Sequence, residues 1–121
     1  MSVAVVIGLG FIGGTGAIAR FALDGAVAAR VGSSFPFGTL AVNLSGAFVL
    51  GLLAGAAVHG DALRLAGAGF IGAFTTFSTW ALESHRLAED GQARTAATNF
   101  AASLALGLGA AWLGRHLGAA L

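Results

Sequence analysis

Four long apolar stretches constrain this chain more than any other feature of its sequence. Each is about as long as the roughly 20 residues that an α-helix needs to cross the hydrocarbon core of a bilayer. We place them at about residues 3–23, 38–58, 62–82 and 96–117 of the 121 residues. Most of the charged side chains lie between these stretches or at their edges. The pattern predicts an all-α membrane protein, one domain over residues 1–121 with four transmembrane helices in a lipid bilayer.

The scarcity of charge supports the same fold class. Only 9% of the residues are charged, whereas a soluble domain has about 25%. Too few charges are present to cover the surface of a small soluble domain, so a soluble globule, a disordered chain and a coiled coil are excluded. The lack of cysteine excludes a disulfide framework. A net charge of +1 does not indicate the basic surface that nucleic-acid binding needs.

The orientation in the membrane is not decided by charge. With four spans, both termini and the second loop share one side, which holds two arginines. The other side holds three, and a fourth, Arg20, lies near a helix end. The positive-inside rule acts on such differences. Two interpretations stay open: the chain inserts both ways up, or a small bias still decides.

Glycine is abundant inside the spans, with 20 in the chain. Small residues let membrane helices approach closely, and the chain has three GxxxG pairs: Gly10/Gly14, Gly51/Gly55 and Gly114/Gly118. They predict a tight bundle in which some faces serve a second copy, although any one pair could arise by chance at this glycine content. A GxGxxG match at Gly8–Gly13 is not taken as a nucleotide site, because no alternating strand–helix pattern follows it.

Polar residues within the spans are candidates for function, because polar groups in hydrocarbon need partners or a water-filled path. Thr39 and Asn43 are four residues apart and share a helix face. Asn43 could solvate an anion or clamp another helix. Ser103 could extend a polar track or simply pack as a small residue, and Arg20 could snorkel or attract anions into a vestibule.

The third span has the densest polar cluster. Four hydroxyls are interleaved with aromatic rings just past its middle: Thr75, Thr76, Ser78 and Thr79, with Phe74, Phe77 and Trp80. A helix broken there would free carbonyls, which is allowed at membrane depth only where they line a cavity or hold an ion. Such carbonyls suit Na⁺, and hydroxyls with positive ring edges suit a small anion. We favour the broken helix over an intact one whose threonines bond to the preceding turn. No catalytic set is present, so we expect no enzyme.

The chain resembles the Fluc/CrcB family of bacterial fluoride channels. Three segments carry the resemblance, in order and spacing over nearly the whole chain: Gly13-Gly-Thr-Gly-Ala-Ile-Ala-Arg20-Phe21, Phe35-Pro-Phe-Gly-Thr39-Leu-Ala-Val-Asn43-Leu-Ser-Gly46 and Gly69-Phe-Ile-Gly72-Ala-Phe-Thr75-Thr-Phe77-Ser-Thr79.

This resemblance implies an antiparallel, dual-topology homodimer in the cell's inner (plasma) membrane, with two fluoride pores and passive export of toxic fluoride. It further implies that the break in the third helix holds a structural Na⁺ at the dimer centre through backbone carbonyls, which by motif fall at Gly72 and Thr75.

The resemblance also places the fluoride pathway on particular side chains. Asn43 is the pore asparagine, Phe77 the first of two pore phenylalanines, and Ser103 the serine of the fourth helix. Trp80 stands where the family has its second phenylalanine, and its indole could use its N–H or narrow the path. Gly107 offers no side chain at a second polar position. The expected pathway also includes four further hydroxyl residues: Thr39, Thr76, Ser78 and Thr79. The vestibule residue is Arg20.

Two other functions fit a small four-helix membrane protein. One is a multidrug-type exporter, which is disfavoured because no carboxylate lies deep within a span. The other is a non-transporting subunit that only packs against a partner.

Overall fold

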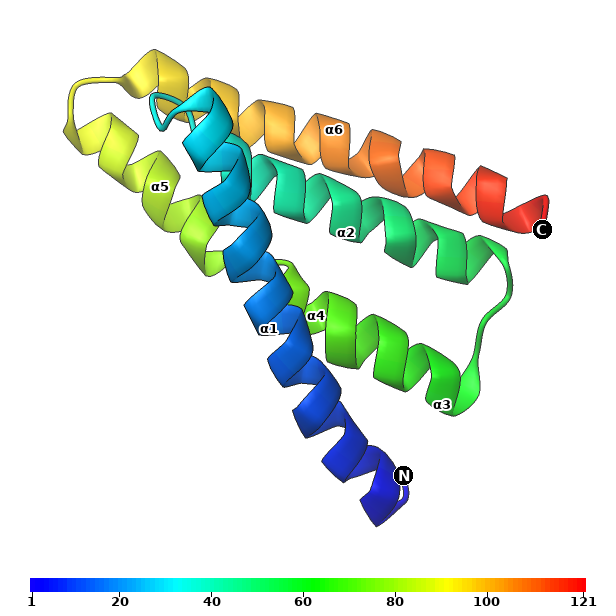
Figure 1. Cartoon of the computed structure of the whole chain (residues 1–121). Coiled ribbons are helices and arrows are strands. Elements are labelled where there is room, and N and C mark those ends of the chain that lie inside the picture. The colour runs from blue at the N-terminus through cyan, green and yellow to red at the C-terminus, as the bar shows by residue number, and fades with distance from the viewer.

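The computed structural model describes all 121 residues as helices and short connections. Four helical segments are long and apolar enough to cross a membrane: α1 (Val3–Val31), α2 (Phe37–Gly55), the composite segment Gly60–Glu89 and α6 (Ala93–Ala119). The chain is therefore a multi-pass membrane protein by length and composition, as the sequence predicts. Figure 1 shows α2 and α6 side by side, with α1 crossing in front of the third segment.

The first helix is longer than the predicted stretch 3–23. Ser2 caps its start, since the hydroxyl accepts a hydrogen bond from the N–H of Val5 at 3.2 Å. The helix continues past Asp24 and Arg30 and ends at Val31, and the next residue, Gly32, has a φ of 80° that suits glycine. The prediction followed the apolar length, but charged residues at a membrane edge do not end a helix. The last helix is likewise longer than residues 96–117, and α2 ends at Gly55, three residues before the predicted 58.

Glycines join α2 to α6. A Cβ on Gly51 or Gly55 would collide with the carbonyls of Ala111 or Arg115, and one on Gly114 or Gly118 with the carbonyls of Phe48 or Leu52. The two helices therefore approach along both predicted GxxxG pairs. The third pair, Gly10/Gly14, has nothing within 4 Å of either position in the chain.

The third segment is interrupted, as the polar cluster predicts. It begins as α3 (Gly60–Leu63), continues as the π-helix η1 (Arg64–Ile71) and ends its first half with α4 (Gly72–Phe74). Thr75 is extended, with φ −79° and ψ 161°, and α5 (Ser78–Glu89) starts the second half.

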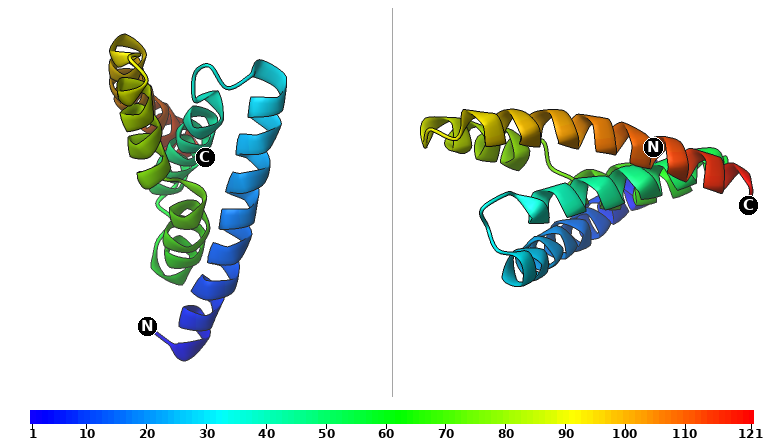
Figure 2. Two further views of the ribbon diagram at one scale, coloured as in Figure 1. Left: turned by 90° about the vertical axis from the view of Figure 1, so that its left-hand side faces the viewer. Right: turned by 90° about the horizontal axis from the view of Figure 1, so that it is seen from above.

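The break lets the two halves pack against different partners. The first half lies against α1, where a Cβ on Gly16 would collide with the carbonyl of Phe70. The second half, α5, lies against α6. The left view of Figure 2 shows the two halves offset from each other at the break, with the first half beside α1. The unwound residues consequently lie where α1, α2 and α6 can all reach the segment.

Candidate functional site

Asn43 holds the unwound backbone. Its Nδ2 donates a hydrogen bond to the carbonyl of Thr76, and its Oδ1 accepts one from the N–H of Thr76, both at 2.8 Å. One side chain of α2 thus replaces both hydrogen bonds that Thr76 would make in an intact helix. Since a primary amide has two N–H donors, one hydrogen of Asn43 stays unused by the chain. The two roles left open for Asn43, clamp and ion contact, are compatible.

The break leaves both backbone carbonyls and backbone N–H groups without helical hydrogen-bond partners. No backbone N–H donates to the carbonyls of residues 72–75, at the end of α4. At the start of α5, the N–H groups of Phe77 and Ser78 have no acceptor within the chain. The N–H of Thr79 is capped by the Thr76 hydroxyl at 3.2 Å. Carbonyl ends of half-helices suit cations, and N-terminal ends suit anions.

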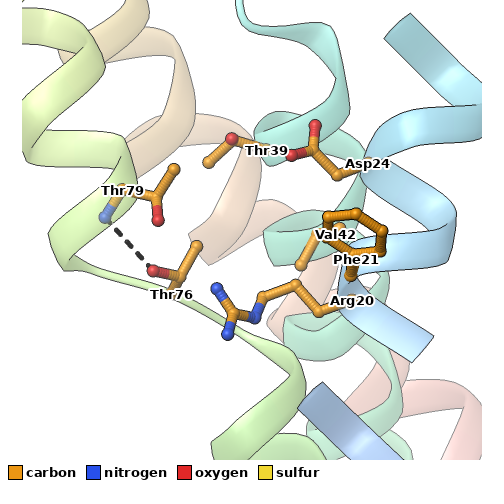
Figure 3. A pocket seen from close by; sticks show the side chains of 7 residues that line it. All are labelled: Arg20, Phe21, Asp24, Thr39, Val42, Thr76 and Thr79. Carbon is orange, nitrogen blue, oxygen red and sulfur yellow. Dashed lines mark hydrogen bonds between the residues drawn. The ribbon is translucent and has the colours of Figure 1, made fainter. Parts of the chain in front are cut away.

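A small cavity of about 100 Å³ lies between α1, α2 and the break (Figure 3). Its walls carry one cation, one carboxylate and several hydroxyls: Arg20, Phe21, Asp24, Thr39, Val42, Thr76 and Thr79. The Arg20 side chain extends from α1 toward Thr76. Its Nε is buried without a hydrogen-bond partner, and Arg20 forms no ion pair in the chain. The cavity therefore offers a guanidinium that forms no ion pair, although the carboxylate of Asp24 belongs to the same lining.

Thr39 faces this cavity but already has a partner. The residue is 3% exposed, and its hydroxyl donates to Glu83 Oε1 at 2.5 Å. This carboxylate, on α5, is a residue that the sequence reasoning did not include in the site. Its position near the end of the third span hid it, and only the approach of α2 to α5 shows that it orients Thr39.

A second hollow, a groove of about 260 Å³, lies on the other side of Thr76, between the break and α6. It is lined by polar and aromatic side chains: Asn43, Thr75, Thr76, Phe77, Trp80, Ser103 and Leu104. Thr76 lines both hollows. Phe77 is 72% exposed and meets Trp80 edge to face, with ring centroids 5.3 Å apart. The two hollows are separate, and Thr76 is the residue that lines both.

Trp80 packs between the break and α6. Its indole N–H points at the carbonyl of Asn99 on α6, at 3.4 Å, and its ring stacks on Phe100 with centroids 4.8 Å apart. The side chain is 7% exposed. The N–H is therefore directed at α6, and the ring of Trp80 is the part that lines the groove.

Most of the predicted site residues come together at the break. The groove gathers Asn43, Thr75, Phe77, Trp80 and Ser103, and the cavity gathers Arg20, Thr39 and Thr79. Two predicted residues, Gly72 and Ser78, are exposed and line neither hollow. Three polar residues near these hollows, Glu83, Ser84 and Asn99, are not among the site residues predicted from the sequence.

The fold and the site define a multi-pass membrane protein whose polar groups gather at a discontinuous helix, an arrangement found in proteins that carry ions. A family model described as CrcB-like protein, Camphor Resistance (CrcB), matches residues 6–115. The chain therefore belongs to the CrcB family.

Relatives with assigned names are similar over most of their length. The chain is 53% identical over 116 residues to fluoride-specific ion channel FluC 2 of Mycolicibacterium paratuberculosis, covering 96% of this chain and 95% of that one. It is 47% identical to FluC 1 of Symbiobacterium thermophilum, covering 91% and 94%, and 44% identical to FluC of Geobacter sulfurreducens, covering 90% and 92%. These relatives are named as ion channels and not as enzymes.

The clamp on the break can be tested by replacing Asn43 with leucine, which keeps the approximate volume. The backbone N–H and carbonyl of Thr76 then lose both partners, and we expect a loss of about 2 kcal/mol in unfolding free energy. Thermal unfolding of purified protein in detergent, followed by circular dichroism, measures the change. Ser45→Ala is the matched control on α2, because the Ser45 hydroxyl bonds only to carbonyls of its own helix. Equal stability of the two variants would contradict the clamp.

Proposed function

We propose that this protein is a fluoride-specific ion channel that lets fluoride leave the cell down its gradient through the plasma membrane. The proposal rests on two polar-lined hollows at the break, the Arg20 cavity and the Asn43 groove, which share Thr76 and in this proposal form one route for the ion. We propose fluoride as the ion because the relatives are named as fluoride-specific ion channels.

The chemistry of the route suits a small, strongly hydrated anion. Arg20 supplies a positive charge that attracts an anion but makes no ion pair within the chain. The unused N–H of Asn43 is a neutral donor that replaces water without holding the ion too long, the compromise that conduction requires. The Phe77 ring next to it can offer its positive edge.

We further propose that a second copy closes the groove. The groove opens to the outside of the single chain, and polar groups that faced lipid there would lack partners. A copy inserted the opposite way up would cover these groups and provide a second, equivalent pathway. The nearly even distribution of arginines between the two sides supports such dual insertion.

The donor set at the break fits a structural Na⁺. The carbonyls of Gly72 and Thr75 accept no backbone hydrogen bond, and Gly72 is exposed, so its oxygen is accessible to a second chain. Oxygen ligands without formal charge suit a monovalent cation. In this proposal, the bound ion would neutralise the ends of the two α4 helices where the copies meet.

Fluoride efflux from proteoliposomes, followed with a fluoride electrode, tests the channel function. Wild-type protein should release fluoride but not chloride. Arg20→Gln should lower the initial rate about fivefold, because a unit charge screened by water is worth roughly 1 kcal/mol at about 4 Å. Arg64→Gln is the matched control, because Arg64 is exposed and pairs with Asp61. Absence of fluoride efflux from wild type would end this proposal, and proton-coupled dye transport would favour the exporter.

Dual insertion can be tested with single cysteines, because the chain has none of its own. Ser33→Cys lies in the first loop and His59→Cys in the second, on opposite sides of the membrane in a four-span chain. A membrane-impermeant maleimide added to intact spheroplasts should label about half of each variant if the chain inserts both ways. Full labelling of one and none of the other would show a single orientation.

The sodium site predicts a cation-dependent stability. Replacing Na⁺ by N-methylglucamine at constant ionic strength should lower the midpoint of thermal unfolding in detergent, and each tenfold increase in Na⁺ above its dissociation constant should add about 1.4 kcal/mol per site. K⁺ is the control, because it is also an alkali cation but a larger one, at the same ionic strength. A midpoint that is the same in all three cations would refute the site.

A further inference from the structure

Asn99 is the most deeply buried polar side chain in the protein. It lies on α6 with 1% of its surface exposed and packs where α5 meets α6. Its partners are Ser84 on α5 and Ser103 one turn farther along α6. The pathway described above does not include Asn99, so its burial needs another explanation.

The direction of each hydrogen bond in this network follows from one fixed acceptor. The carbonyl of Trp80 can only accept, so the Ser84 hydroxyl donates to it, at 3.0 Å. The oxygen of Ser84 then accepts from Nδ2 of Asn99, at 2.8 Å. This contact turns Oδ1 of Asn99 toward Ser103, whose hydroxyl donates to it at 3.4 Å. The amide orientation is therefore determined by Ser84.

The network affects the groove through Ser103. This residue lines the groove with Asn43, and its hydroxyl has a single proton. That proton is directed at Asn99, so the groove meets the Ser103 oxygen, which repels anions. At 3.4 Å the bond is long and weak. An arriving anion can compete for the proton, but it has to break this bond first.

We propose that Asn99 is a positioning residue for the Ser103 hydroxyl. It holds the proton of Ser103 while no ion is present and releases it to a passing anion, which weakens binding enough for rapid exit. This inference rests on the proposed channel function. It assigns to Asn99 an effect on affinity for the ion, exerted through Ser103, that is separate from its packing between α5 and α6.

The test measures the fluoride concentration that gives half-maximal efflux from proteoliposomes. Asn99→Leu removes the acceptor, so the Ser103 proton is free and the half-saturating concentration should fall about threefold, as expected when one weak hydrogen bond no longer has to be broken. In a Ser103→Ala background the same substitution should cause no shift. Thr98→Val on the neighbouring exposed position of α6 is the matched control and should leave the value unchanged.

The double substitution separates positioning from packing. A shift of equal size with and without the Ser103 hydroxyl would mean that Asn99 acts only by holding α5 against α6, and it would overturn the inference. So would an unchanged half-saturating concentration in Asn99→Leu. If wild-type protein shows no fluoride efflux, the channel proposal itself fails. If wild-type protein conducts but the effects of Asn99→Leu and Ser103→Ala on the half-saturating concentration are additive, only the role of Asn99 is refuted.

A milder variant covers the case in which Asn99→Leu does not fold. Ser84→Ala leaves Asn99 in place but removes the partner that fixes its amide, which can then rotate and donate to Ser103. The half-saturating concentration should fall about twofold, again only when Ser103 is present. An unchanged value in Ser84→Ala would overturn the inference as well.

Discussion

The pairing of Asn43 with the backbone of Thr76 is the interaction on which the rest of the structure depends. In hydrocarbon, each backbone polar group needs a partner, so a helix can be unwound only where other groups replace its hydrogen bonds. Asn43 supplies a donor and an acceptor at 2.8 Å. Without them, the backbone N–H and carbonyl of Thr76 would lack partners in the membrane, and the break would be less stable.

The break gives one helix two different partners and two different electrostatic ends. Its first half packs against α1 and its second half against α6. Carbonyls without backbone donors end the first half, and N–H groups without acceptors begin the second. The proposed cation and anion sites therefore arise from the same event, the unwinding of about three residues. The side chains around them then adjust how strongly an ion is held.

Two of the expected hydroxyl donors are already paired within the protein. Thr39 donates to Glu83, and Ser103 donates to Asn99. In the proposed channel, each hydroxyl serves an anion only by leaving its partner, so the partners would set the balance between binding and release. Residue type alone predicts hydroxyl groups that are free to donate to an ion. In the structure, these two hydroxyls already donate to acceptors within the protein.

The sequence by itself determined the class of fold and the place of the break, because apolar length and clustered hydroxyls are local properties of the chain. Through resemblance to a family, it also placed Asn43, Phe77 and Ser103 on one expected pathway, and the structure gathers the three in one groove. Only the tertiary structure decided that Asn43 clamps Thr76, that Trp80 turns its N–H to α6, and that Glu83 and Asn99 accept hydrogen bonds from two hydroxyls. Each of these contacts joins residues on different helices or depends on how two helices approach, so its geometry follows from packing and not from spacing along the chain.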